Sequence, residues 1–250
     1  MKVIILAAGQ GSRLHPYTFN TPKALIKING LPLLEWQLRH LLCANIKEFI
    51  VVTGFKHSKV EQLFQSFKSQ YPEIKYDLIY NSAYATSENI VSCNLALNYY
   101  QEDCILINGD VLFDPQLVRQ LIAYREQPIN VVYTVKDSYD DDDMKIIKQN
   151  NCLKQIGKTI PFHLVQGESL GIIGLTASGA KKLYQETSSL LLNSENRHSW
   201  YLKAINCLAQ KEAIGLVKAA SPHWCEIDYP KDLLIATQLT NLWLPVGSVQ

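Results

Sequence analysis

The sequence has almost no excess of charge of either sign, with 24 Lys and Arg residues against 23 Asp and Glu residues. A net charge of +1 provides no electrostatic footprint for duplex nucleic acid or an anionic membrane surface. No run of 18 apolar residues occurs, so no membrane-spanning helix is expected. The apolar run at residues 3–8 is too short for a signal peptide. We therefore expect a cytoplasmic protein without nucleic-acid or membrane partners.

Cysteine motifs are also absent. No C-x-x-C pair occurs, and no short ladder of Cys and His suggests a zinc site. The cysteines are Cys43, Cys93, Cys104, Cys152, Cys207 and Cys225. In a chain of 250 residues, cysteines this scattered are expected to be reduced and mostly buried thiols.

Apolar residues make up 47% of the chain and fall into short runs that alternate with helical patterns. Runs rich in β-branched and aromatic residues predict strands at residues 3–7, 49–53, 76–80, 104–107 and 130–135. Apolar stripes at helical spacing predict helices at residues 33–42, 60–67, 89–99 and 115–124. This alternation predicts an α/β fold with a doubly wound, mostly parallel, Rossmann-like sheet. Ligands of such sheets bind at the carboxyl ends of the strands.

After residue 136 the pattern changes. Residues 144–147 and 153–157 predict a β-hairpin, and residues 163–176 predict another extended segment. Further helices are expected at residues 177–192 and 199–209, further strands at residues 213–217 and 224–227, and a final helix that opens at Pro230. Since no linker, repeat or low-complexity segment is visible, we predict one domain over residues 1–250.

The first candidate site follows the first predicted strand and reads Leu6-Ala7-Ala8-Gly9-Gln10-Gly11-Ser12-Arg13-Leu14. Its glycines let the backbone turn tightly and bring N–H groups close to an anion. Arg13 and, further on, Lys23 add positive charges suited to phosphate oxygens. Two standard phosphate loops are excluded, because Leu14 replaces the third glycine of the dinucleotide fingerprint and no Gly-Lys-Ser/Thr follows.

This loop, together with Pro22-Lys23, resembles the signature of the sugar-1-phosphate nucleotidylyltransferase superfamily, and the resemblance extends over nearly the whole chain. It implies a nucleotide-diphospho-sugar transferase-like fold whose loop wraps the triphosphate and base. Arg13 would contact the outer phosphates, and Lys23 the phosphate being transferred. The implied nucleotide-binding residues are Leu6, Ala7, Ala8, Gly9, Gly11, Ser12, Arg13, Lys23, Glu88 and Asn89.

Two carboxylates complete the resemblance. Asp110 follows a predicted strand in Asn108-Gly109-Asp110, and Asp228 follows the late strand at residues 224–227. In the superfamily such residues hold Mg²⁺, which binds through one or two carboxylates plus substrate phosphates. The implied catalytic set is Arg13, Lys23, Asp110 and Asp228, with the two aspartates as metal ligands. An acceptor phosphate oxygen then attacks the α-phosphorus of a nucleoside triphosphate, and pyrophosphate leaves in line.

The second half resembles the short cytidylyltransferase-like members, which activate phosphocholine, 2-aminoethylphosphonate, phosphoinositol or phosphoglutamine. The motifs are Asp143-Met144-Lys145, Ile156-Gly157-Lys158 and Glu168-Ser169-Leu170-Gly171. They imply CTP as donor, a small phosphorylated or phosphonylated acceptor, and acceptor binding by Lys145, Lys158, Glu168 and Trp224. By analogy alone, the product would feed capsule or cell-envelope synthesis.

The same resemblance divides the chain into a nucleotide-binding half (1–136), an acceptor-binding half (137–229), and a C-terminal helix and tail (230–250). It leaves a homodimer open. Glu168, Trp200 and Trp224 offer the carboxylate and rings that an ammonium head group favours, although buried tryptophans are more often core. The run Asp140-Asp141-Asp142-Asp143 is expected to be a solvated loop.

Three alternatives remain. A sugar-1-phosphate uridylyl- or thymidylyltransferase differs only in base preference. Gly167-Glu168-Ser169-Leu170-Gly171 also matches the G-x-S-x-G elbow of serine hydrolases, which requires a strand before the serine and a helix after it. The third is an inactive nucleotide-binding subunit that regulates a partner.

Overall fold

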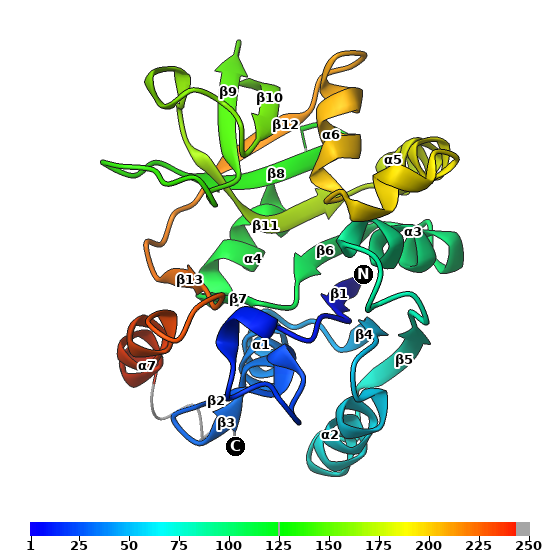
Figure 1. Ribbon diagram of the computed structural model, residues 1–250, viewed down its shortest axis with the longest axis vertical. Coiled ribbons are helices and arrows are strands. Elements are labelled where there is room, and N and C mark those ends of the chain that lie inside the picture. Colours follow the sequence, from blue (N-terminus) through cyan, green and yellow to red (C-terminus); the bar gives the residue numbers. More distant parts are fainter. Residues whose placement is uncertain (125, 244–250) are drawn as a thin grey trace.

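Figure 1 shows the computed structural model, which describes residues 1–124 and 126–243. Residues 244–250, in the predicted C-terminal tail, lie outside the described residues. Within the described part, the main sheet has the strand order β5-β4-β1-β6-β11-β8-β12-β10-β9. No helix among the described residues is long and apolar enough to cross a bilayer.

The strands of this sheet confirm most of the predicted positions. They are β1 (Lys2–Ala7), β4 (Glu48–Thr53), β5 (Lys75–Tyr80), β6 (Cys104–Asn108), β8 (Ile129–Thr134), β9 (Lys145–Gln149), β10 (Cys152–Gly157), β11 (Glu168–Leu175) and β12 (Gly215–Lys218). Short strands β2 (Lys27–Ile28) and β3 (Leu31–Pro32) pair with each other, as do β7 (Val111–Phe113) and β13 (Trp224–Glu226).

The α/β fold is confirmed, and its sheet is mixed. Strands β5, β4, β1 and β6 pair in parallel, as expected, and so do β8 and β12. The other neighbours pair antiparallel: β6 with β11, β11 with β8, β12 with β10, and β10 with β9. Antiparallel strands need no crossover helix, so β9 and β10 are joined by a tight turn in which Asn150 and Asn151 have positive φ.

Helices cover both faces of the sheet, as the doubly wound prediction requires. One core cluster joins the sheet to α1 (Leu33–Cys43), α2 (His57–Gln70) and α4 (Pro115–Ala123). The other joins it to α3 (Asn89–Tyr99), α5 (Ala177–Leu191) and α6 (Leu202–Ala209). Along β1, alternate residues enter the two clusters, since successive strand side chains point to opposite faces.

The extended segment predicted from residue 163 becomes a strand only at Glu168, because Phe162–Leu164 form a short 3-10 helix. Two predicted helices also start later than expected. The helix predicted from residue 199 begins at Leu202, because Trp200 stays outside the helix and the Tyr201 N–H bonds to the Asn89 side chain (3.0 Å). The final helix, α7 (Asp232–Trp243), begins two residues after Pro230 and packs beside β2 and β13 (Figure 1). The Asp232 carboxylate accepts bonds from the N–H groups of Asp228 and Tyr229, which fixes the approach to this helix.

Candidate active site

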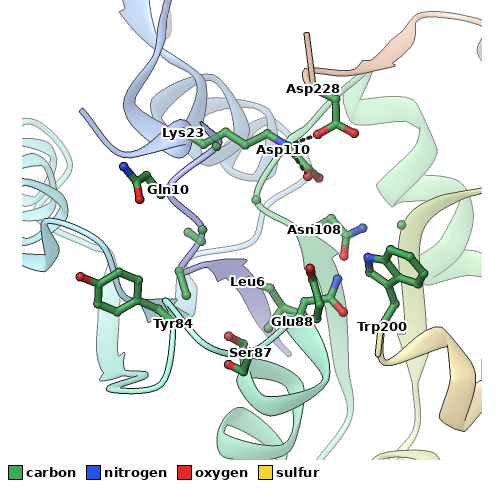
Figure 2. Close-up of a pocket in the computed structure, with 18 of the residues that line it drawn as sticks. Leu6, Gln10, Lys23, Tyr84, Ser87, Glu88, Asn108, Asp110, Trp200 and Asp228 are labelled. Atoms are coloured by element: carbon green, nitrogen blue, oxygen red, sulfur yellow. Dashed lines mark hydrogen bonds and ion pairs between the residues drawn. The ribbon is translucent and has the colours of Figure 1, made fainter. Parts of the chain in front are cut away.

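A cleft of about 480 Å³ opens at the carboxyl ends of β1 and β6, where a doubly wound sheet binds its ligands. The loops after these strands line one part of it. The segment before α3, the segment before β9, the turn after β10, β11, the segment before α6 and the end of β13 also contribute to its lining. In Figure 2, Gln10 and Tyr84 lie on one side of the view, and Asn108 and Trp200 on the other. The cleft is therefore built by segments far apart in the sequence.

Most of the predicted site residues lie in this cleft. Those that line it are Leu6, Ala7, Ala8, Gly9, Gly11, Ser12, Arg13, Lys23, Glu88, Asn89, Asp110, Lys158 and Asp228. Gly11 has φ +75°, and a Cβ there would lie 2.8 Å from the Cβ of Lys23. Glycine at this position therefore allows both the left-handed turn and the close passage of the Lys23 side chain.

The Lys23 ammonium lies between two carboxylates, as Figure 2 shows. Its Nζ is 2.7 Å from Asp110 Oδ2 and 2.5 Å from Asp228 Oδ1. Burial by itself lowers the pKa of Lys23, but the charges of Asp110 and Asp228 outweigh it, so the pKa is raised. Residues separated by 205 positions thus form one charged cluster beside the loop after β1.

Asp110 is positioned by contacts of the neighbouring backbone. Gly109 donates its N–H to the Leu6 carbonyl (3.0 Å), and a Cβ at Gly109 would lie 2.5 Å from that oxygen. The buried Gln37 amide of α1 donates to the carbonyls of Asn108 (3.0 Å) and Val111 (2.7 Å). The turn that carries Asp110 is therefore fixed against both β1 and α1.

Glu226 is a cleft residue that the sequence analysis missed. Burial, together with the neighbouring charges of Asp110 and Asp228, raises its pKa to about 8. The cleft is lined by the cations Arg13, Lys23 and Lys158 and by the acids Glu88, Asp110, Asp142, Glu226 and Asp228. A pKa of about 8 leaves Glu226 mostly protonated at neutral pH, so four ionised acids lie beside three cations. A polyanionic substrate therefore needs additional positive charge to bind.

The acidic cluster fits a hard divalent cation. Asp110 Oδ1 is buried without a hydrogen-bond partner, and Asp110 and Asp228 approach the same cation, the Lys23 ammonium. Among the described residues, no group of three or more His, Cys, Asp or Glu side chains forms a complete metal cage. Mg²⁺ is typically bound by one or two carboxylates, while water and substrate phosphate oxygens occupy its other coordination positions.

The loop at residues 140–143 is exposed at residues 140–142, as expected, but it also reaches the cleft through Asp142. Asp142 accepts bonds from Arg13 Nη1 (3.2 Å), Lys158 Nζ (3.0 Å) and the Tyr229 hydroxyl (2.7 Å). These bonds lower the pKa of Asp142, with the Tyr229 hydroxyl contributing most. Arg13 Nη2 also lies 2.9 Å from Asp228 Oδ2. The acidic run therefore supplies a cleft side chain, which its local composition did not indicate.

Lys145 and Glu168 do not line the cleft, contrary to the sequence prediction. They face each other across β9 and β11 and are 1% and 3% exposed. Met144, which directly precedes β9, and Ser169 on β11 line the cleft, and successive residues of extended backbone point to opposite faces, so Lys145 and Glu168 point away from it. Burial raises the pKa of Glu168 to about 7, while its ion pair with Lys136 opposes this shift.

Trp224 also lies outside the cleft. It pairs with Phe113 across β13 and β7 and packs against the core cluster that contains α1. Because a strand rises about 3.3 Å per residue, Trp224 lies about 7 Å along β13 from the cleft residue Glu226. Trp200, in contrast, lines the cleft, and its ring lies under the Lys158 ammonium at 4.4 Å.

The structure also excludes the serine-hydrolase elbow. Ser169 lies inside β11, which continues to Leu175, so the serine is followed directly by strand and not by a helix. Its side chain is buried, and its Oγ accepts a bond from the N–H of Gly171 (3.2 Å). Ser169 therefore lacks the strand-to-helix turn that a nucleophile elbow requires.

Comparison with known proteins places this geometry in a family. The model described as the MobA-like NTP transferase domain matches residues 3–186. The chain belongs to this family. A nucleotidyltransferase resemblance, expected from the loop and the two aspartates, is thereby confirmed at the family level.

Individual relatives of this MobA-like NTP transferase domain differ in the acceptor that their names specify. A choline-phosphate cytidylyltransferase of Haemophilus influenzae is 40% identical over 116 residues, 46% of this chain and 46% of the relative. The chain thus matches about half the length of that curated relative. A CTP:phosphoglutamine cytidylyltransferase of Campylobacter jejuni is 23% identical over 93% of this chain and 98% of its own.

The fold has close structural counterparts. The structure of an inositol-1-phosphate CTP transferase from T. maritima aligns with a TM-score of 0.76, 20% sequence identity, and coverage of 96% of each chain. Identity this low shows the shared fold alone. This shared fold agrees with the nucleotide-diphospho-sugar transferase-like architecture predicted from the sequence.

Proposed function

We propose that this protein is a Mg²⁺-dependent cytidylyltransferase that transfers CMP from CTP to a small phosphorylated or phosphonylated acceptor and releases pyrophosphate. The observation that carries the proposal is the Lys23 ammonium between Asp110 and Asp228, beside the loop after β1. Two carboxylates and two loop cations are what an in-line phosphoryl transfer requires to bring anionic reactants together. The choice of CTP is supported by the names of the relatives.

In this proposal, Asp110 and Asp228 would hold Mg²⁺, and the bound ion would supply positive charge to the phosphate oxygens. Lys23 then exchanges its carboxylate partners for an α-phosphate oxygen, and Arg13 binds the outer phosphates. The loop backbone at Gly9 and Gly11 lies against the triphosphate. No side chain acts as a nucleophile, so the residues accelerate the reaction by positioning and by charge compensation.

Thermal stability in the presence of nucleotides tests this proposal. CTP with Mg²⁺ at a hundred times its dissociation constant is expected to add about 2.7 kcal/mol, because it binds only the native state. For a chain of this size, that corresponds to a Tm rise of roughly 5–10 °C. The measurement compares CTP, UTP, dTTP, ATP and GTP, each with and without Mg²⁺.

Matched lysine variants make the test specific. Lys23→Met is expected to lose the CTP shift, whereas Lys27→Met retains it, because Lys27 is exposed on β2 outside the cleft. A shift with UTP or dTTP instead of CTP would favour the sugar-1-phosphate alternative. The absence of a shift with every nucleotide would contradict the proposed function.

A further inference from the structure

Each Lys and Arg that lines the cleft already has an acidic partner among the described residues. Lys23 pairs with Asp110 and Asp228, Arg13 pairs with Asp142 and Asp228, and Lys158 pairs with Asp142. A substrate phosphate that binds these cations must replace such a partner. Asp110 and Asp228 have a second role as the proposed metal ligands, which leaves Asp142 without an explanation.

The surroundings of Asp142 are those of a phosphate group. Its two oxygens accept bonds from a guanidinium, an ammonium and a phenol, contributed by Arg13, Lys158 and Tyr229. These are donors that phosphate oxygens also accept from. The three donors come from the loop after β1, the turn after β10 and the segment before α7, so they converge on this carboxylate from distant parts of the chain.

Neighbouring residues hold the Asp142 backbone while its side chain stays accessible. Asp143 is anchored by Lys136 (2.9 Å), and the buried Lys145 Nζ donates to the Lys158 carbonyl (2.7 Å) and to the carbonyls of Asp141 and Asp143 (3.4 Å each). The Asp142 side chain is 46% exposed. An exposed carboxylate can leave its partners without unfolding the loop that carries it.

We propose that Asp142 is an internal substitute for a substrate phosphate group and that substrate binding displaces it from Arg13 and Lys158. This inference rests on the proposed function. The cleft cation for this phosphate is then Lys158, and Lys145 is a positioning residue beneath it. The Lys158 ammonium lies over the Trp200 ring, which holds it in the cleft when Asp142 leaves.

Anion titrations of Asp142→Asn test this proposal. Exposed ion pairs shift an equilibrium by up to about fivefold each, so removing this internal competitor is expected to tighten phosphate binding about fivefold. Inorganic phosphate and inorganic pyrophosphate are titrated separately by calorimetry. Tighter binding of phosphate alone assigns the position to the acceptor phosphate, and tighter binding of pyrophosphate assigns it to the outer phosphates of the triphosphate.

Two further variants separate displacement from a general loss of negative charge. Asp141→Asn makes the same charge change at an exposed neighbour whose side chain is outside the cleft, and is expected to leave both affinities unchanged. Adding Lys158→Gln to Asp142→Asn is expected to remove the gain. Unchanged or weaker binding of both anions by Asp142→Asn would overturn the proposal, as would a gain that persists without Lys158.

This outcome is independent of turnover. A gain in anion affinity that depends on Lys158, in a protein that releases no pyrophosphate from any nucleotide, would support the displacement of Asp142 and refute the proposed transferase activity. Pyrophosphate release by a protein whose Asp142→Asn variant shows no gain in anion affinity would support the transferase activity and refute the displacement of Asp142.

Discussion

Replacing Asp110 by asparagine is expected to lower kcat by roughly 10²–10³. The variant removes one of the two carboxylates proposed to hold Mg²⁺, while its amide oxygen can still accept a bond from Lys23. Lys23 also keeps its pair with Asp228. Because Lys23 keeps a carboxylate partner, the free energy of unfolding is expected to fall by only about 1 kcal/mol, the size of a typical single substitution.

Asp77→Asn is the matched control for this variant. Asp77 lies on β5 outside the cleft, in a half-exposed ion pair with Lys2 at 3.5 Å. Its activity is expected to equal that of the native protein. Initial rates of pyrophosphate release and urea unfolding should be measured on both variants. Native turnover in Asp110→Asn would show that this carboxylate has no part in the reaction.

Gly109→Ala is expected to damage the site through sterics alone. The added Cβ would lie 2.5 Å from the Leu6 carbonyl oxygen and 2.9 Å from the Ala7 Cα, both in the backbone. The ends of β1 and β6 must then separate, which is expected to cost about 3 kcal/mol of stability. Because the same movement carries Asp110 away from Lys23, kcat should fall by at least about tenfold.

Gly157→Ala provides the control, since a Cβ at Gly157 meets nothing within 4 Å. Its stability is expected to change by less than about 0.5 kcal/mol. Urea unfolding and rates of pyrophosphate release compare the two variants. If Gly109→Ala were as stable and as active as Gly157→Ala, the close approach of β1 and β6 would not matter for Asp110.

The sequence predicts the elements well where hydrophobic periodicity is strong. The helix at residues 89–99 has the predicted bounds, and most of the strands lie within one or two residues of their predicted ends. The short β7 was missed because three residues are too few to show a period of two. The β9–β10 hairpin was predicted. The antiparallel pairings of β11 with β6 and β8, and of β12 with β10, were missed because strand order depends on pairing between distant segments.

The candidate site was predictable where a contiguous motif carries it. The loop at residues 6–13, Lys23, Asp110 and Asp228 all come together in the cleft. Lys145 and Glu168 could not be placed in the same way, because a shift of one residue along a strand decides which face a side chain occupies. Asp142 reaches Arg13 across 129 residues, a distance that no local pattern reports.

The most direct test of the central claim is a ³¹P NMR spectrum of CTP and Mg²⁺ incubated with the protein and one acceptor at a time. The acceptors are phosphocholine, 2-aminoethylphosphonate, phosphoglutamine and inositol 1-phosphate. With one of them, we expect equal amounts of pyrophosphate and a new CMP-linked product, and neither without an acceptor. Pyrophosphate from UTP or dTTP with a sugar 1-phosphate, and none from CTP with these acceptors, would contradict the account.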